Sequence, residues 1–143
     1  MTIARLIAGR DGEIWSCHAD DSVAQAVELL ATKRIGALPV RDGGESVAGI
    51  FSERDVLYCL KAHGAAALDL KVREVMTATP ITVTPETKVL EALALMTRRR
   101  IRHLPVVHDD ALVAFVSIGD LVKYRIDAIE ADAEAMRSYI QMA

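Results

Sequence analysis

Two serine–aspartate pairs are the residues of this 143-residue chain whose spacing best suits ligand chemistry. Ser52 and Asp55 are separated by two residues, and so are Ser117 and Asp120. Each pair follows an apolar run, where Ser-x-x-Asp is typical of a helix capping box. A helix N-terminus that carries a hydroxyl also suits a phosphate, and a carboxylate can accept hydrogen bonds from both hydroxyls of a ribose. Capping and ligand binding are compatible, so both interpretations stay open.

Positive charge is densest in the run from Arg98 to His103. Arg98 and Arg99 suit the solvated C-terminal end of a helix, where cations are favourable. Arg102 and His103 directly precede a Leu-Pro-Val run, and we expect them to bind phosphate. Arginine offers a planar fork of donors for that purpose, whereas histidine contributes charge only if an anion raises its pKa.

Catalytic and metal-binding patterns find little support. The sequence has no HExxH, no Walker loop and no GxSxG, and its four histidines lack zinc spacing with Cys17 and Cys59. Cys17 and His18 could form a nucleophile pair, but adjacent residues on a strand point to opposite faces. We therefore expect a non-catalytic chain without a metal. The two separated cysteines suit reduced, buried thiols in a cytoplasmic protein.

The composition predicts a globular protein that stays in solution. The chain is 52% hydrophobic and 26% charged, with a net charge of −3 and 4% aromatic residues. The acidic balance and scarce aromatics disfavour nucleic-acid binding. No apolar stretch approaches the roughly 20 residues of a membrane helix, and the first ten residues lack the apolar core of a signal peptide. We expect a cytoplasmic location and no membrane contact.

The chain contains an internal repeat with an offset of 66 residues. The segment Arg34–Val40 returns as Arg100–Val106, and the apolar positions before it return as well. Even the lead-in around Ile3 resembles that around Val72. One copy alone would bury too little surface to be stable. We therefore expect two half-domains that pack on each other around a pseudo-twofold axis.

Each copy reads as β–α–β–β–α. An apolar stripe at helical spacing opens the first copy, with a capping box formed by Ser22 and Gln25. In the second copy, Pro85 stands where a helix can begin. A first strand, a turn and a second strand follow, and then a helix from the Ser-x-x-Asp motif. The expected strands are 37–41, 47–51, 103–108 and 112–116, the later helices run from Ser52 to Leu60 and from Ser117 to Ile126, and 61–70 links the copies.

A C-terminal tail continues the last helix without a counterpart in the first copy. Ile126, Ile129, Ala133, Met136 and Ile140 recur in alternating steps of three and four residues. An amphipathic helix must bury such a stripe. It could cap its own chain or pack on a partner subunit, and we favour a homodimer.

The ordered double pattern resembles the cystathionine-β-synthase (CBS) domain pair, or Bateman module. Both copies carry Arg-Ile-x-x-Leu-Pro-Val, a turn, and then Ser-x-x-Asp, over roughly residues 1–127. The resemblance implies an α/β fold of two pseudo-twofold-related β-α-β-β-α repeats packed through their sheets, plus a C-terminal helix. Its domains would be 1–65, 71–127 and the helix 128–143.

The resemblance also implies a regulatory function. In this family the cleft between the repeats holds adenosine ligands: AMP, ADP, ATP, NAD(H) or S-adenosylmethionine. Binding would change the angle between the repeats, and a protein target would sense that change. The alternative is an interaction module or accessory subunit whose cleft is empty or vestigial.

Carried onto this chain, the resemblance implicates two sites. One contains Ser52, Arg54 and Asp55, and the other contains Ser117 and Asp120. Because Gly119 takes the place of Arg54, the two sites should differ in phosphate affinity. The adenine walls would be Trp15, Ser16, Ile35, Ala37 and Pro39 in one half and Thr82, Thr84, Ile101 and Pro105 in the other, with Arg102 and His103 beside the second wall.

Overall fold

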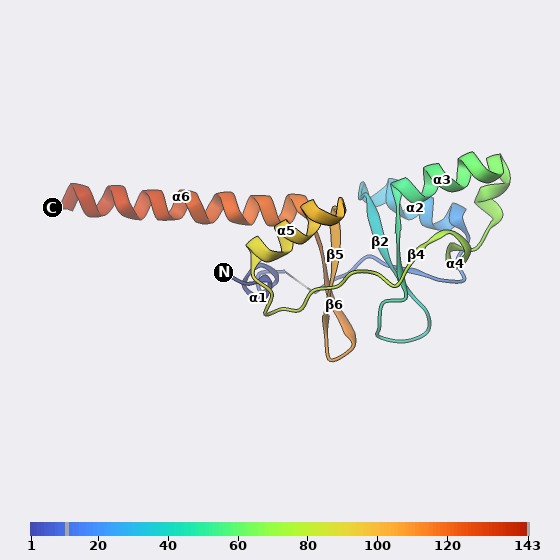
Figure 1. Cartoon of the computed structure of the whole chain (residues 1–143), viewed down its shortest axis with the longest axis horizontal. Helices are drawn as coiled ribbons and strands as arrows, with labels where there is room; N and C mark the ends of the chain where they lie inside the picture. Colours follow the sequence, from blue (N-terminus) through green and yellow to red (C-terminus); the bar gives the residue numbers. More distant parts are fainter. Residues whose placement is uncertain (11, 143) are drawn as a thin grey trace.

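The computed structural model describes residues 1–10 and 12–142 and forms two halves, each with its own core (Figure 1). The first half has a sheet in the order β1-β2-β3-β4 and the second has the hairpin β5-β6. The first half therefore follows the predicted β–α–β–β–α order. In the second half the first strand is reduced to a single parallel bridge between Val83 and Val106, and the predicted helix, two strands and helix follow. The first half contains β1 (Cys17–His18), α2 (Val23–Lys33), β2 (Ala37–Arg41), β3 (Gly49–Ser52), α3 (Glu53–His63), a 3₁₀ helix (Gly64–Asp69), α4 (Val72–Val75) and β4 (Thr77–Ala78). Outside it lie α1 (Ile3–Ile7), α5 (Val89–Arg99), β5 (His103–His108), β6 (Ala111–Ser117) and α6 (Ile118–Met142).

Local signals place most of these elements. The Ser22 hydroxyl accepts the Gln25 N–H at 3.1 Å and the Gln25 side chain accepts the Ser22 N–H at 2.8 Å, so the predicted capping box of α2 is confirmed. The predicted strands 37–41 and 103–108 are confirmed as β2 and β5. Both strands have nearly fully buried central residues, which explains their continuous apolar sequence.

The predicted helix start at Pro85 is wrong. Helix α5 begins at Val89, four residues later. The carbonyl of Pro85 accepts the N–H of Ala4 at 2.8 Å, and the carbonyl of Thr87 accepts the N–H of Ile3 at 2.9 Å. These bonds hold the segment around Pro85 extended against the N-terminus, a long-range contact that no local pattern reveals.

The two halves exchange their lead-in segments. Helix α1 lies beside the second half in Figure 1, and Ile3 is fully buried in the core that contains Val89 and Leu104. Conversely, Val72 of α4 is fully buried in the core of the first half, and its N–H binds the carbonyl of Asp21 at 2.8 Å. Each core is thus completed by chain that precedes the other repeat.

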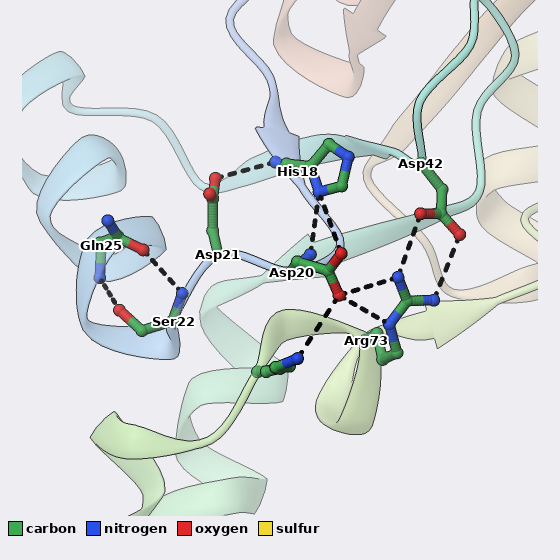
Figure 2. A network of polar contacts seen from close by, with 8 residues as sticks. His18, Asp20, Asp21, Ser22, Gln25, Asp42 and Arg73 are labelled. Atoms are coloured by element: carbon green, nitrogen blue, oxygen red, sulfur yellow. Dashed lines mark hydrogen bonds and ion pairs between the residues drawn. The ribbon is translucent and has the colours of Figure 1, made fainter.

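An ion-pair network fixes the second of these lead-ins (Figure 2). The Arg73 guanidinium donates to Asp20 at 2.9 Å and to both carboxylate oxygens of Asp42, at 3.0 and 3.2 Å. Hydrogen bonds from Arg73 hold the pKa values of both carboxyl groups below their usual range, despite an opposing contribution from desolvation. The network therefore ties α4 to the end of β1 and to the turn after β2.

Helix α6 is one continuous helix of 25 residues. Its first turns pack through Leu121 on the second core, and the remainder runs out beyond the body (Figure 1). The predicted continuation of the last helix into the C-terminal tail is therefore confirmed. None of the helices in the described ranges is long and apolar enough to cross a membrane.

Candidate functional site

Two pockets lie where the halves meet, each around one Ser-x-x-Asp motif. The Asp55 pocket has a volume of about 370 Å³, and the Asp120 pocket has a volume of about 480 Å³. Both volumes are in the range of small-molecule sites. The Asp55 pocket is lined by Ser52, Arg54, Tyr58, Thr77, Thr79–Ile81 and Arg100–His103, among others. The Asp120 pocket is lined by Ser117, Phe115, the segment Gly12–Trp15 and Arg34–Ala37, among others.

The two pockets are related by the sequence repeat. Adding 66 to Gly12–Trp15 gives residues 78–81, and adding 66 to Arg34–Ala37 gives Arg100–His103. All of these residues except Ala78 line the corresponding pockets. Arg34 and Arg100 close helices α2 and α5 in the left-handed conformation, each with φ of 54°. A left-handed residue is a common way for a helix to end, and here each such arginine also lines one pocket.

The pockets share one wall, made of Gly36, Ala37, Arg102 and His103. A Cβ atom placed on Gly36 would lie 3.4 Å from His103 Cε1, so the two strand entries face each other at close range. Arg102 and His103 were expected beside the second adenine wall only, but they line both pockets. A substitution in this shared wall would therefore alter the lining of both pockets.

The two serine–aspartate motifs form capping interactions. Asp55 accepts the Ser52 N–H at 2.9 Å and Asp120 accepts the Ser117 N–H at 2.9 Å. In return, the serine hydroxyls accept the aspartate N–H groups at 3.4 and 3.1 Å. The capping interpretation is therefore confirmed. All four side chains are half-buried and also line the pockets, which leaves ligand binding open to them.

The carboxylates differ in their other partners. Asp120 pairs with the Arg10 guanidinium at 2.9 Å, whereas Asp55 accepts the Thr77 hydroxyl at 3.3 Å. Desolvation raises the pKa of Asp120, but the Ser117 N–H and Arg10 outweigh it, so the pKa of Asp120 lies below its usual value. A ligand hydroxyl must therefore share Asp120 with a cation. Among the described residues, Asp55 accepts hydrogen bonds only from neutral donors, namely Ser52 and Thr77.

The backbone explains this difference. In the first half, β4 pairs with the edge of β3. The two strands lie so close that a Cβ atom on Gly49 of β3 would be 2.7 Å from the carbonyl oxygen of Thr77 in β4. The equivalent position in β6 is Ala114, and the edge carbonyl of Phe115 is instead bound by the Arg10 guanidinium at 3.2 Å. The arginine side chain thus occupies the edge that β4 occupies in the first half, and this brings it to Asp120.

His103 lies stacked in the shared wall. Its ring is parallel to that of Phe115, with an interplanar angle of 8° and a centroid distance of 5.5 Å. Burial and the neighbouring Arg102 lower the pKa of His103, with Asp120 and Glu53 acting in the opposite direction. The imidazole is therefore neutral near pH 7 before any anion binds.

Other reactive groups are poorly placed for catalysis. Burial, followed by the charge of Asp21, raises the pKa of Cys17 to about 12, so its thiol is a weak nucleophile. His18, Asp20 and Asp42 bring potential metal-ligand atoms within 4.8 Å of one another. All three are exposed, and Figure 2 shows the Arg73 guanidinium already between the two carboxylates.

The structure brings together most of the predicted site residues. Those lining the Asp55 pocket are Ser52, Arg54, Asp55, Ile101, Arg102 and His103, with Ala37 from the shared wall. Those lining the Asp120 pocket are Trp15, Ile35, Ala37, Arg102, His103, Ser117 and Asp120. In the described chain the lining of neither pocket includes Ser16, Pro39, Thr82, Thr84 or Pro105. Pro39 and Pro105 are buried within β2 and β5, and Thr82 and Thr84 are exposed.

Sequence reasoning missed the segments before the first strands. Besides the predicted Trp15, the pocket walls include Gly12–Ile14, Thr77 and Thr79–Ile81, a few residues earlier than the predicted wall residues. The 66-residue offset relates these segments to each other, but their sequences are dissimilar, so the repeat alone did not mark them. Arg10 was missed because it is 110 positions from Asp120 in the chain.

Known proteins share this arrangement. A family profile described as "CBS domain" matches residues 11–62 and 72–127. The mitochondrial CBS domain-containing protein CBSX3 of Arabidopsis thaliana is 42% identical over 135 residues, which is 92% of this chain and 66% of that protein. The solved CBS-domain protein ATU1752 of Agrobacterium tumefaciens is 31% identical, with a TM-score of 0.83 over 87% of this chain and 99% of that one. The solved structure of CBSX2 in complex with AMP is 26% identical, with a TM-score of 0.77 over 89% and 97%.

The curated relatives are longer than this chain. The chain spans just under two thirds of CBSX3 and 41% of an archaeal relative from Thermofilum pendens. The two solved structures, by contrast, are covered almost completely.

Proposed function

This chain belongs to the CBS-domain family, and we propose that it is a regulatory, non-catalytic module that binds adenine nucleotides between its two repeats. Binding would change how the repeats sit on each other, and a partner protein would sense the change. The effector class is AMP, ADP, ATP, NAD(H) or S-adenosylmethionine, and a cytoplasmic location stays part of the proposal.

One observation carries this proposal: each repeat supplies a carboxylate at a helix start, and both carboxylates face pockets with a common basic wall. Asp55 and Asp120 are suited to ribose hydroxyls, and Arg102 suits phosphate. The solved structure of CBSX2, which matches over 89% of this chain, contains AMP. This relative supports adenosine as the ligand class.

The Asp55 pocket is the better candidate for a phosphorylated ligand. It is lined by Arg54, Arg100 and Arg102, whereas the Asp120 pocket is lined by Arg34 and Arg102. Its carboxylate also lacks the ion pair that Asp120 makes with Arg10. We therefore expect nucleotides with more phosphate groups to prefer the Asp55 pocket.

Conformational change would follow from the exchanged lead-ins. Thr77 and Thr79–Ile81 line the Asp55 pocket, and their segment continues from α4, which is held on the first core. Arg10 follows α1, which is held on the second core. A ligand that contacts these segments acts on both halves, so it can favour one relative position of the halves over another.

Isothermal titration of ligand-free protein with AMP, ATP, NADH and S-adenosylmethionine tests this function. We expect saturable heat with at least one of them and a matching rise in melting temperature. Absence of both effects with all four compounds would refute nucleotide sensing. Adenine-free controls, such as GMP and inorganic phosphate, show whether the adenine base is read.

A second candidate is an accessory module whose cleft holds no ligand. The ion pair between Arg10 and Asp120 favours it for one pocket, because the carboxylate already has a partner. Replacing Arg10 with alanine discriminates the two functions. A binding pocket should change its nucleotide affinity in Arg10→Ala, whereas an accessory module should show only a change in stability.

A further inference from the structure

The exposed part of α6 presents an apolar stripe to solvent. Ile126, Ile129, Met136 and Ile140 have exposed fractions of 48%, 51%, 61% and 66%. Figure 1 shows this part of the helix running away from the body, where the rest of the described chain gives it no cover. Large apolar side chains exposed in one contiguous row mark an interaction surface.

The stripe follows a heptad repeat. Val122, Ile126, Ile129, Ala133, Met136 and Ile140 are spaced by steps of four, three, four, three and four residues. These steps alternate d and a positions of a coiled coil over about three heptads. A helix that only caps its own domain needs a wider apolar face, including e or g positions. Here those flanking positions carry mainly charged side chains.

The charged residues on either side of the stripe favour a second copy of this chain as the partner. With Ile126 at position a, the g positions include Arg125 and Asp132, and the e positions include Glu130 and Arg137. In a parallel dimer, each g residue lies near the e residue five positions further along the partner. Arg125 would then face Glu130 of the other copy, and Asp132 would face Arg137, so both pairs attract.

From this pattern we infer that α6 forms a parallel, in-register coiled coil with α6 of a second copy. The geometry leaves room for the bodies. Leu121 points into the chain's own core and Val122 begins the stripe, so the two directions differ by about 100° around the helix. A twofold axis along the coiled coil would therefore direct the two bodies to opposite sides.

Cysteine cross-linking tests the arrangement in the full chain. In Met136→Cys, a parallel in-register pair places the two thiols opposite each other, so mild oxidation should give a disulfide-linked dimer on a non-reducing gel. Ser138→Cys is the matched control, because position f points away from the seam. The native Cys17 and Cys59 are buried and should not react. A dimer from both variants, or from neither, contradicts the inference.

A charge exchange tests the pairing independently. Asp132→Arg and Arg137→Asp each place like charges together, so each should lower the dimer fraction measured by light scattering. The double variant restores attraction and should recover the dimer. Failure of the double variant to recover, with helicity by circular dichroism unchanged, would contradict parallel pairing. A wild-type chain that is monomeric at 100 µM would overturn the inference altogether, whatever its nucleotide affinity.

Discussion

At the residue scale, Asp55 and Asp120 make the same capping bond but face different partners. Each accepts a serine N–H at 2.9 Å, and only Asp120 is held by a guanidinium. A capping role predicts a loss of stability on mutation, whereas a ligand role predicts a loss of affinity. The chain has a further capping box, at Ser22 and Gln25, which is not part of either pocket lining. A variant of that box shows the effect of a lost cap on stability alone, so the two roles can be measured separately.

We predict that Asp55→Asn weakens nucleotide binding while the chain stays folded. Asparagine can still accept the Ser52 N–H, but it loses the charge that strengthens a hydrogen bond to ribose. Charged hydrogen bonds contribute about 1.5–3 kcal/mol, so the Kd measured by isothermal titration should rise roughly 10- to 100-fold.

Gln25→Ala is the matched control for Asp55→Asn. It removes a capping interaction of the same kind from α2, so it should lower the melting temperature without changing the Kd. If both variants lose stability and neither loses affinity, the Ser-x-x-Asp motif of the Asp55 pocket is a helix cap only.

His103 predicts a pH dependence of binding. Its pKa is lowered in the free protein by burial and by Arg102, so a bound phosphate must raise it again. Binding is then coupled to proton uptake, and affinity should strengthen as the pH falls from 8 to 6. Because phosphate groups also titrate near pH 6, the wild type must be compared with His103→Gln. An identical pH profile in both proteins would exclude His103 from the phosphate site.

The same lowered pKa makes a prediction for stability. The unfolded chain binds a proton at His103 more readily than the folded chain does, so stability is lost as the pH falls below the ordinary histidine value of about 6.5. His103→Gln should remove this part of the pH dependence in urea denaturation. An unchanged slope between pH 7 and 5 would contradict the burial argument.

At the element scale, the lead-in that carries Thr77–Ile81 is positioned by Arg73. This residue has no equivalent in the other lead-in, where the corresponding position is Ala4. We predict that Arg73→Ala lowers affinity in the Asp55 pocket and lowers the melting temperature, and that both effects shrink at high salt because the pairs are exposed. Lys71→Ala is the control, since its ammonium lies 3.8 Å from Asp20 and does not reach Asp42 in the described contacts. Equal effects of the two variants would contradict a specific role for Arg73.

Sequence predicted those elements whose determinants are local. The capping box of Ser22 and Gln25 and the apolar runs of β2 and β5 are each encoded within a few residues, and they were found where expected. Pro85 was misread because the N-terminal segment binds its carbonyl, across more than 80 positions. The shared wall likewise required knowing how the repeats face each other, which periodicity does not reveal.

At the scale of the whole molecule, the exchange of lead-ins couples the halves. Ile3 belongs to the second core and Val72 to the first, although each precedes the other repeat in the chain. Neither half can lose its structure without releasing a segment that completes the other. A ligand between the halves therefore acts on a cooperative unit rather than on two independent domains.

We predict that Ile3→Ala destabilises the chain as a whole. Removing a fully buried isoleucine side chain down to alanine costs about 2–5 kcal/mol, and urea denaturation should show one transition at a lower midpoint. Leu90→Ala, on an exposed side of α5, is the control and should change stability by only about 0.5 kcal/mol. Two separate transitions, of which only one moves, would show that the halves are independent.

The central claim is that both Ser-x-x-Asp carboxylates hold adenine nucleotides between the repeats. The most direct measurement is isothermal titration of AMP into ligand-free wild-type chain and into the double variant Asp55→Asn/Asp120→Asn, with Gln25→Ala alongside. The account predicts saturable binding to the wild type and to Gln25→Ala, and binding weakened at least 10-fold in the double variant. Equal affinity in all three proteins, or no heat from the wild type with AMP or any other adenine nucleotide, would contradict it.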